Sequence, residues 1–234
     1  MSQPPPPPPP PPPPSDSWPP SPPPPPGAGG EFRVGDAISY GWNAYWKNVG
    51  PLFLLALVIA AVYLVISLIS SGVSGVAGRV VFQIIIFIVG IIVAMGLIRA
   101  SLAVVEGRQP DVRMLLETDG FGPYAVAAIL VGIGVAVGLL LFIVPGIFLL
   151  IIWQFFGYVI LETPTTGPVD AMRRSAEVTR GHRWQLLGLG LLLFGINIIG
   201  ALACLVGLLF TYGITAVSVA YAYKNLSGQP VVAV

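Results

Sequence analysis

Four long runs without a charged residue constrain this chain more than any other feature of its sequence. Asp, Glu, Lys and Arg are all absent from residues 48–78, 80–98, 121–161 and 184–223. A helix that crosses a bilayer needs roughly 20 apolar residues, because each residue adds about 1.5 Å to its length. The last two runs, each about forty residues long, are too long for one span and fit two. The sequence therefore predicts an all-α integral membrane protein with six transmembrane helices.

These six predicted spans pair into three hairpins. We place them at 51–70, 80–104, 123–143, 146–162, 184–205 and 208–224. Pro145 and Gly146 predict the turn of the second hairpin, because proline removes a backbone donor and glycine adopts the dihedral angles of a tight reversal. The third hairpin offers only Gly207 and Gly213 for its turn, so the sequence leaves the position of that turn open.

Positive residues gather on one side of the predicted spans. Nine of the eleven lie there: Arg33, Lys47, Arg108, Arg113, Arg173, Arg174, Arg180, Arg183 and Lys224. Arg79 falls on the opposite side, and Arg99 lies within the second span near the majority side. By the positive-inside rule, both termini are cytoplasmic. We therefore expect a multi-pass protein of a bacterial plasma membrane, and its net charge of +1 does not indicate a surface for nucleic acid.

The N-terminal segment differs sharply from the rest. Eighteen of the 25 prolines lie in residues 1–26, and a proline series forms an extended, solvated rod. We therefore expect a disordered tail over 1–30, a transmembrane domain over 31–226 and a short C-terminal tail over 227–234. The rod is either a spacer or a docking strip for a cytoplasmic protein, and in the second case Trp18 is the candidate binding anchor.

Each hairpin follows a stretch with the pattern of a helix that lies in the membrane interface. These stretches are residues 35–53, 109–124 and 167–183, and each contains a Gly-Pro pair. The first has aromatic and aliphatic residues on one helical face and polar residues on the other. The sequence therefore predicts three repeated units, each an interfacial amphipathic helix followed by a transmembrane hairpin, that form a pseudo-symmetric bundle.

The third interfacial stretch carries the candidate contacts for lipid headgroups. They are Arg173, Arg174, Arg180, His182 and Arg183. A four-residue spacing predicts ion pairs between Asp170 and Arg174 and between Arg173 and Glu177, which leaves the last three cationic residues free for phosphates. The cluster is interpreted either as a general anchor at the cytoplasmic face or as a specific lipid site, so membrane lipids are the expected partners.

A few polar residues lie inside the predicted spans. Arg99, Gln154 and Asn197 are candidates for a polar path through the membrane. The alternatives are that Arg99 extends to the cytoplasmic edge and that the two amides form bonds between helices. Gly134 with Gly138, and Ala203 with Gly207, have the spacing of closely packed helices.

Motifs that carry chemistry are absent from the sequence. It contains no nucleophile elbow, phosphate-binding loop or set of metal ligands, and its one cysteine, Cys204, lies in an apolar stretch. We therefore predict no enzymatic activity, catalytic residue, cofactor or metal. Two functions remain: a membrane scaffold whose residues 1–26 recruit a cytoplasmic partner, and a transporter or lipid-handling protein with a path near Arg99, Gln154 and Asn197. The sequence does not predict the oligomeric state.

One pattern points to known proteins. Ala171, Ser175, Thr179, Gly181 and Trp184 form an A-x-x-x-S-x-x-x-T-x-G-x-x-W series after the Pro-Gly-Ile turn. With its proline-rich head, the chain resembles proline-rich multi-pass membrane proteins of actinobacteria. Residues 32–226 also resemble uncharacterised six-span bacterial proteins related to the membrane domain fused to some glycerophosphodiester phosphodiesterases. That resemblance implies a fold and no activity, because the catalytic domain is absent.

Overall fold

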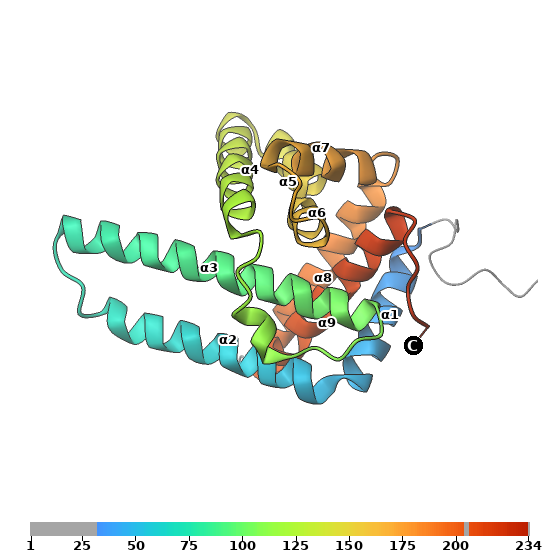
Figure 1. The fold of residues 1–234 in the computed structure, drawn as a ribbon, viewed down its shortest axis with the longest axis horizontal. Coiled ribbons are helices and arrows are strands. Elements are labelled where there is room, and N and C mark those ends of the chain that lie inside the picture. The colour runs from blue at the N-terminus through green and yellow to red at the C-terminus, as the bar shows by residue number, and fades with distance from the viewer. Residues whose placement is uncertain (1–31, 204–205, 234) are drawn as a thin grey trace, which may run out of the picture.

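The computed structural model describes residues 32–203 and 206–233, so the predictions for residues 1–26, Trp18 and Cys204 lie outside it. Within the described residues all regular secondary structure is helical (Figure 1). The elements are α1 (Val34–Lys47), α2 (Val49–Ser70), α3 (Val76–Val105), the short 3-10 helix η2 (Val112–Leu115), α4 (Phe121–Leu141), α5 (Ile143–Trp153), α6 (Phe156–Glu162), α7 (Pro168–Val178), α8 (Arg183–Leu202) and α9 (Val206–Leu226).

Five helical segments are long and apolar enough to cross a membrane. They are α2, α3, α4, the α5–α6 segment Ile143–Glu162 and α8. Their outer surfaces expose large apolar side chains such as Leu68, Leu140 and Leu202. A protein in water rarely exposes apolar surface on this scale, so the helices are compatible with a membrane protein. The sixth predicted span, 208–224, falls on α9, which is not one of the five.

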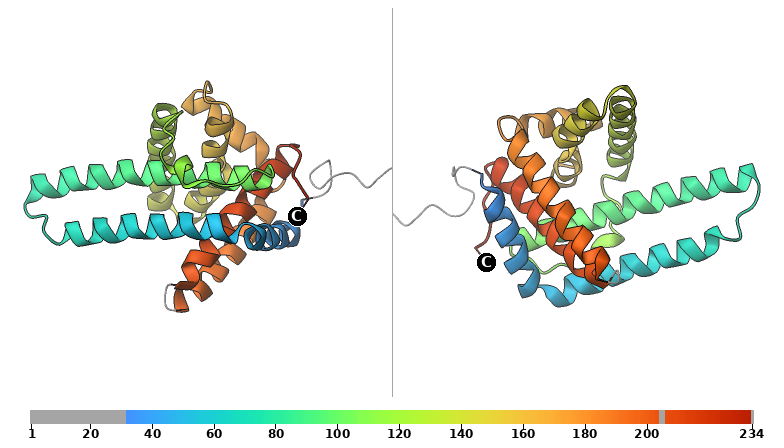
Figure 2. Two further views of the ribbon diagram at one scale, coloured as in Figure 1. Left: turned by 60° about the horizontal axis from the view of Figure 1, so that its bottom comes forward. Right: turned by 180° about the vertical axis from the view of Figure 1, so that it is seen from behind.

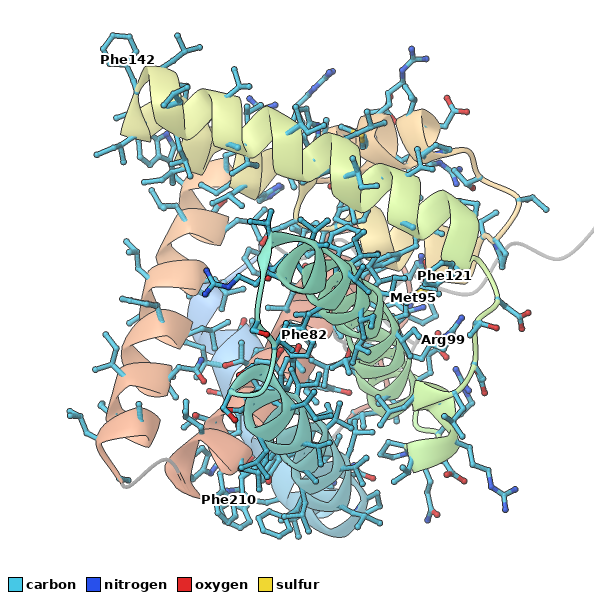
Figure 3. The ribbon with its side chains drawn as sticks, turned by 90° about the vertical axis from the view of Figure 1, so that its left-hand side faces the viewer. Phe82, Met95, Arg99, Phe121, Phe142 and Phe210 are labelled. Atoms are coloured by element: carbon cyan, nitrogen blue, oxygen red, sulfur yellow. The ribbon has the colours of Figure 1, made fainter. Side chains whose placement is uncertain are left out.

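The long helices form three antiparallel pairs that point in different directions. The α2–α3 pair projects away from the remaining helices, while α4–α5 and α8–α9 follow two other directions (Figures 1 and 2). In Figure 3, Phe121 at the start of α4 lies near Arg99 of α3, whereas Phe142 lies at the far end of α4. The three pairs therefore diverge from one another, and the pseudo-symmetric bundle of three repeated units stays a prediction. Uncharged helices have little to drive their association in lipid, so polar contacts at one end set the arrangement.

The turn predicted at Pro145 and Gly146 lies three residues earlier. Phe142 is the extended residue between α4 and α5, and Pro145 lies in the first turn of α5, where a backbone donor is not needed. A β-carbon on Gly146 would lie 2.7 Å from the backbone nitrogen of Leu139, which explains why this position is glycine. In the third pair, α8 ends at Leu202 and Gly207 lies within α9.

The interfacial helix predicted at 109–124 is also wrong. Before α4 begins at Phe121, the segment is loop with one short helical turn, η2. Asp111 caps η2, and its side-chain Oδ1 accepts a hydrogen bond from the Arg113 amide at 2.8 Å. Of the apolar residues that suggested an amphipathic stripe, Leu115 is buried, Val112 is half-buried and Leu116 is exposed. The other two predicted interfacial stretches do contain helices, namely α1 and α7.

Helix α1 packs on α9 through a close approach of backbones. Gly41 faces Ser218, and a β-carbon on Gly41 would lie 1.9 Å from the Ser218 Oγ and 2.9 Å from the Ile214 carbonyl oxygen. Tyr45 is fully buried and its ring lies against Gly213. The buried face of α1 therefore contacts α9, while Trp42, predicted to lie on the same face as Tyr45, is half exposed.

This contact predicts that Gly41→Ala destabilises the protein. The methyl group has no space, so we expect a loss of roughly 1–3 kcal/mol in the free energy of unfolding. Gly35→Ala is the matched control, because nothing lies within 4 Å of the β-carbon position there. Thermal unfolding in detergent measures both. Equal melting temperatures for the two variants would contradict the close approach of α1 and α9.

Candidate functional site

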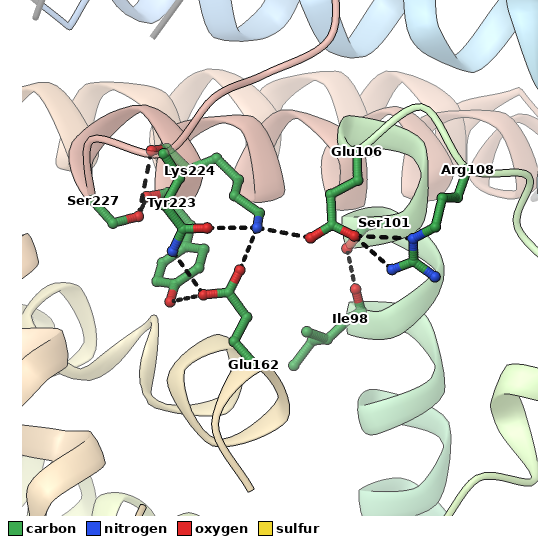
Figure 4. A network of polar contacts seen from close by, with 9 residues as sticks. Ile98, Ser101, Glu106, Arg108, Glu162, Tyr223, Lys224 and Ser227 are labelled. Carbon is green, nitrogen blue, oxygen red and sulfur yellow. Dashed lines mark hydrogen bonds and ion pairs between the residues drawn. The ribbon is translucent and has the colours of Figure 1, made fainter. Parts of the chain in front are cut away.

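Buried and half-buried charged groups converge where the second helices of the three pairs end. Glu106 caps α3, Glu162 is the last residue of α6, and Tyr223 and Lys224 lie in the last turns of α9 (Figure 4). Gln229 follows α9 and returns to the same place. We call these five residues the hub.

Lys224 is the centre of the hub. Its side chain is only 6% exposed. Its ammonium Nζ donates to Glu106 Oε1 at 2.8 Å and to Gln229 Oε1 at 2.6 Å, and it also forms an ion pair with Glu162 Oε1. Two hydrogen bonds and one ion pair therefore connect the ammonium group to three partners. Lys224 thereby joins the ends of all three helix pairs.

The two carboxylates have further donors. The Tyr223 hydroxyl donates to Glu162 Oε2 at 2.6 Å, and the Gln229 amide donates to the same atom at 2.8 Å. Arg108 donates to Glu106 Oε2 through Nη2 at 2.5 Å and through Nε at 3.1 Å. Burial on its own raises the pKa of Glu106, but the hydrogen bonds and positive charges of Lys224 and Arg108 outweigh it and lower that pKa.

Left-handed glycines direct the chain into the hub. Gly107 after α3 has φ of 75° and Gly228 after α9 has φ of 70°, a region that favours glycine. The second reversal brings Gln229 back to Lys224. The chain then continues to Val232, whose amide donates to the Val105 carbonyl at 3.1 Å and whose carbonyl accepts from the Tyr40 hydroxyl at 3.0 Å. The predicted C-terminal tail is therefore packed against the helices up to Val232.

The hub is built to hold helices together. Each carboxylate is paired with a cation, Glu106 with Lys224 and Arg108 and Glu162 with Lys224. Two polar cavities of about 580 and 440 Å³ flank Glu162 and Gln229. Within residues 32–203 and 206–233, no group of three His, Cys, Asp or Glu side chains is arranged to hold a metal ion.

Arg99 reaches from α3 to the loop before α4. Its guanidinium donates to the Glu117 carbonyl, and to the Asp119 carbonyl at 2.6 Å, and its Nε lies 3.4 Å from the Glu117 carboxylate (Figure 3). Its side chain is 13% exposed. Arg99 therefore fixes the loop that replaces the predicted second interfacial helix.

The other two candidates for a polar path have separate partners. Gln154 donates to the carbonyl of Ile151 at 3.1 Å, within the break between α5 and α6. Asn197 donates to the Leu193 carbonyl and to the Thr215 hydroxyl, both at 2.8 Å, and so joins α8 to α9. The three residues therefore bond to different parts of the structure.

The first three residues of the series that begins at Ala171 lie on the buried side of α7 and its C-cap. Ala171, Ser175 and Thr179 are all fully buried. The Ser175 hydroxyl donates to the Ile152 carbonyl at 2.7 Å and accepts from the Phe155 amide at 3.1 Å. These groups lie at the break between α5 and α6, where the regular helical bonds are interrupted. The motif thus joins α7 to this break.

The five candidate lipid contacts occupy different environments. Arg173, Arg174 and Arg180 are exposed. His182 and Arg183 are half-buried: the His182 ring lies edge-on to Phe32 at 6.4 Å, and the Arg183 guanidinium lies 4.9 Å from the Phe148 ring centre. The predicted ion pairs of Arg174 with Asp170 and of Arg173 with Glu177 do not form within the described residues, so both side chains extend separately over the surface.

Sequence reasoning missed the hub, although a signal was present. Glu162 and Lys224 are the first charged residues after the two forty-residue uncharged runs, and Glu106 follows six uncharged residues after Arg99. Charged residues that end apolar helices are therefore candidates for mutual pairing. Gln229 carries no such signal, because its contacts depend on the chain reversal at Gly228.

The fold and the hub define an all-helical protein with apolar helices of membrane length. Residues 79–234 match the family described as "Domain of unknown function (DUF7847)", and the chain belongs to this family. Similar proteins include the uncharacterized protein Rv2560 of Mycobacterium tuberculosis H37Rv and the uncharacterized protein Mb2590 of Mycobacterium bovis. Each is 29% identical over 230 residues, which cover 86% of this chain and 70% of the mycobacterial protein. No solved structure matches the chain.

The contacts of Lys224 predict a large effect of Lys224→Met. Removal of the ammonium leaves two carboxylates facing each other without their shared cation, so we expect a loss of about 3 kcal/mol in the free energy of unfolding. The control is Lys47→Met, which removes an exposed lysine. Thermal unfolding in detergent measures the difference, and the same melting temperature for both variants would show that Lys224 does not hold the helix ends together.

The lowered pKa of Glu106 predicts a pH dependence of stability. A carboxylate whose pKa is lower in the folded state than its ordinary value of 4.5 stabilises the fold above pH 4.5, and that contribution is lost as the pH falls through the lowered pKa. Glu106→Gln should therefore unfold at a lower temperature than the natural protein at pH 7. The difference in melting temperature between the two proteins should become smaller as the pH falls to about 4 and below. A gap that stays constant over this range would contradict an ionised Glu106 in the hub.

Proposed function

We propose that this protein is a non-enzymatic scaffold of a bacterial plasma membrane. In this proposal the chain crosses the bilayer six times, as three hairpins, and α9 is the sixth span. Both termini then lie in the cytoplasm, and the proline-rich residues 1–26 recruit a cytoplasmic protein through Trp18. The relation to the membrane domain of glycerophosphodiester phosphodiesterases stays a prediction.

The observation that carries the proposal is the hub itself. Its charges are directed toward one another, and an arrangement of this kind stabilises a fixed geometry more readily than it binds a substrate in turnover. Because the hub fixes one end of the helices, it suits a scaffold that holds residues 1–26 at the membrane. The first described residues support this, because Phe32 is buried beside His182 and ties the start of α1 to the same body.

The distribution of charge supports the proposed topology. Arg79 lies in the first turn of α3, while Glu106 and Arg108 follow its other end, 27 residues away and about 40 Å along the helix axis. Lys47 and Lys224 lie at the ends of α1 and α9. With the hub in the cytoplasm, most cationic residues satisfy the positive-inside rule.

Transport is the weaker alternative. A transport path requires polar side chains that face a shared route, whereas Arg99, Gln154 and Asn197 each bond to a different element. We therefore favour a scaffold.

The scaffold proposal predicts loss of a protein partner on a single change, Trp18→Ala. Affinity capture from gently solubilised native membranes should recover a cytoplasmic protein with the natural chain, and recover several-fold less with Trp18→Ala or without residues 1–26. The matched control is Trp42→Ala, which removes an exposed tryptophan of α1. Equal recovery with all four proteins would contradict recruitment through the proline-rich segment.

A further inference from the structure

An apolar groove with a single cation in it lies between α5 and α8. It has a volume of about 650 Å³, within the range of roughly 300–1,000 Å³ found for ligand pockets. Its walls are Val144, Ile147, Phe148 and Ile151 from α5 and Leu187 and Leu191 from α8, with Gly181, Arg183 and Trp184 at the start of α8. Apart from Arg183, the lining has no charged group.

Arg183 lacks an anionic partner within the described residues. No ion pair forms there, and its buried Nε makes no hydrogen bond. Its one close favourable contact is with the face of Phe148, 4.9 Å from the ring centre. A half-buried guanidinium with unused donors favours an anion, because it gains most from a bidentate phosphate or carboxylate.

The setting of the groove decides what kind of anion fits. Both α5 and α8 belong to segments of membrane length, so the groove opens among side chains that face lipid. Trp184, beside Arg183, is 84% exposed, and tryptophan favours the level of lipid headgroups. A ligand that fills the groove therefore needs an apolar chain for the walls and an anionic head beside Arg183.

We propose that the α5–α8 groove binds one anionic phospholipid, with an acyl chain between the two helices and the phosphate on Arg183. Charge complementarity selects this occupant: a purely apolar partner leaves the guanidinium without a counter-ion, and a zwitterionic lipid neutralises it less. Of the five candidate lipid contacts predicted from the sequence, Arg183 alone lines the groove, so it is the residue that determines specificity.

The test is photo-crosslinking of the full chain in vesicles. Two vesicle preparations carry the same photoreactive acyl chain, one on phosphatidylglycerol and one on phosphatidylcholine. We expect the phosphatidylglycerol probe to label peptides of α5 and α8 about fivefold more strongly than the phosphatidylcholine probe. Arg183→Gln should abolish this preference, whereas Arg180→Gln, which removes an exposed arginine outside the groove, should retain it.

A second variant keeps the test valid if Arg183→Gln fails to fold. Ile147→Trp fills the groove from the α5 side and leaves every cationic residue in place, so labelling of the groove should fall with both probes. Equal labelling by both probes in the natural chain, or equal effects of Arg183→Gln and Arg180→Gln, would overturn the proposal. Crosslinks from the groove to a second copy of the chain in place of lipid would also overturn it. None of these outcomes depends on residues 1–26, so they are separate from the test of the scaffold.

Discussion

The arrangement of the helices depends on the contacts that the ammonium group of Lys224 makes with Glu106, Glu162 and Gln229. Along most of their length the helices carry no charge, and van der Waals contacts between apolar helices in lipid do not favour one arrangement strongly. Lys224 contributes a directional contact at one end, because it reaches Glu106 at the end of α3, Glu162 at the end of α6 and Gln229 after α9. The Lys224 side chain is only 6% exposed, so its ammonium group loses most of its solvation on folding. Its three partners offset this cost, and they reach Lys224 only when the three helix ends meet.

Other polar contacts extend this principle to the loops. Arg99 fixes the loop before α4 by bonds to two backbone carbonyls, and Ser175 of α7 satisfies the backbone at the break between α5 and α6. Small residues work in the opposite way, by allowing backbones to touch: Gly138 lies against Gly146 within the α4–α5 pair, and Gly41 lies against Ser218 between α1 and α9. The protein thus combines close glycine contacts between neighbouring helices with the charged contacts of the hub, where the helix pairs converge.

The helices could be predicted from the sequence and their arrangement could not. Uncharged runs determine where a helix of membrane length can form, so the predicted spans coincide with α2–α6, α8 and α9 to within a few residues. The periodicity at 109–124 predicts an amphipathic helix, but periodicity alone cannot distinguish a surface helix from a loop. This loop is fixed by a distant residue, Arg99, which donates hydrogen bonds to the Glu117 and Asp119 carbonyls. The hub was not predicted because it also depends on contacts between distant residues: Glu106, Glu162 and Lys224 are separated by 56 and 62 residues in the chain.

The most direct test of this structure is whether the hub lies at one face of the membrane. Single cysteines at Gln109, Thr165 and Ala233 flank the hub, and cysteines at Ser74 and Phe142 mark the far ends of α2–α3 and α4–α5, all in a Cys204→Ser background. Labelling with a membrane-impermeant thiol reagent, in intact cells and in inverted membrane vesicles, locates each site. The hub predicts that the first three react from one side of the membrane and the last two from the other; with the proposed cytoplasmic hub, the first three react only in inverted vesicles. Reaction of Gln109→Cys and Ala233→Cys from opposite sides would separate the ends of α3 and α9 and contradict the central role of Lys224.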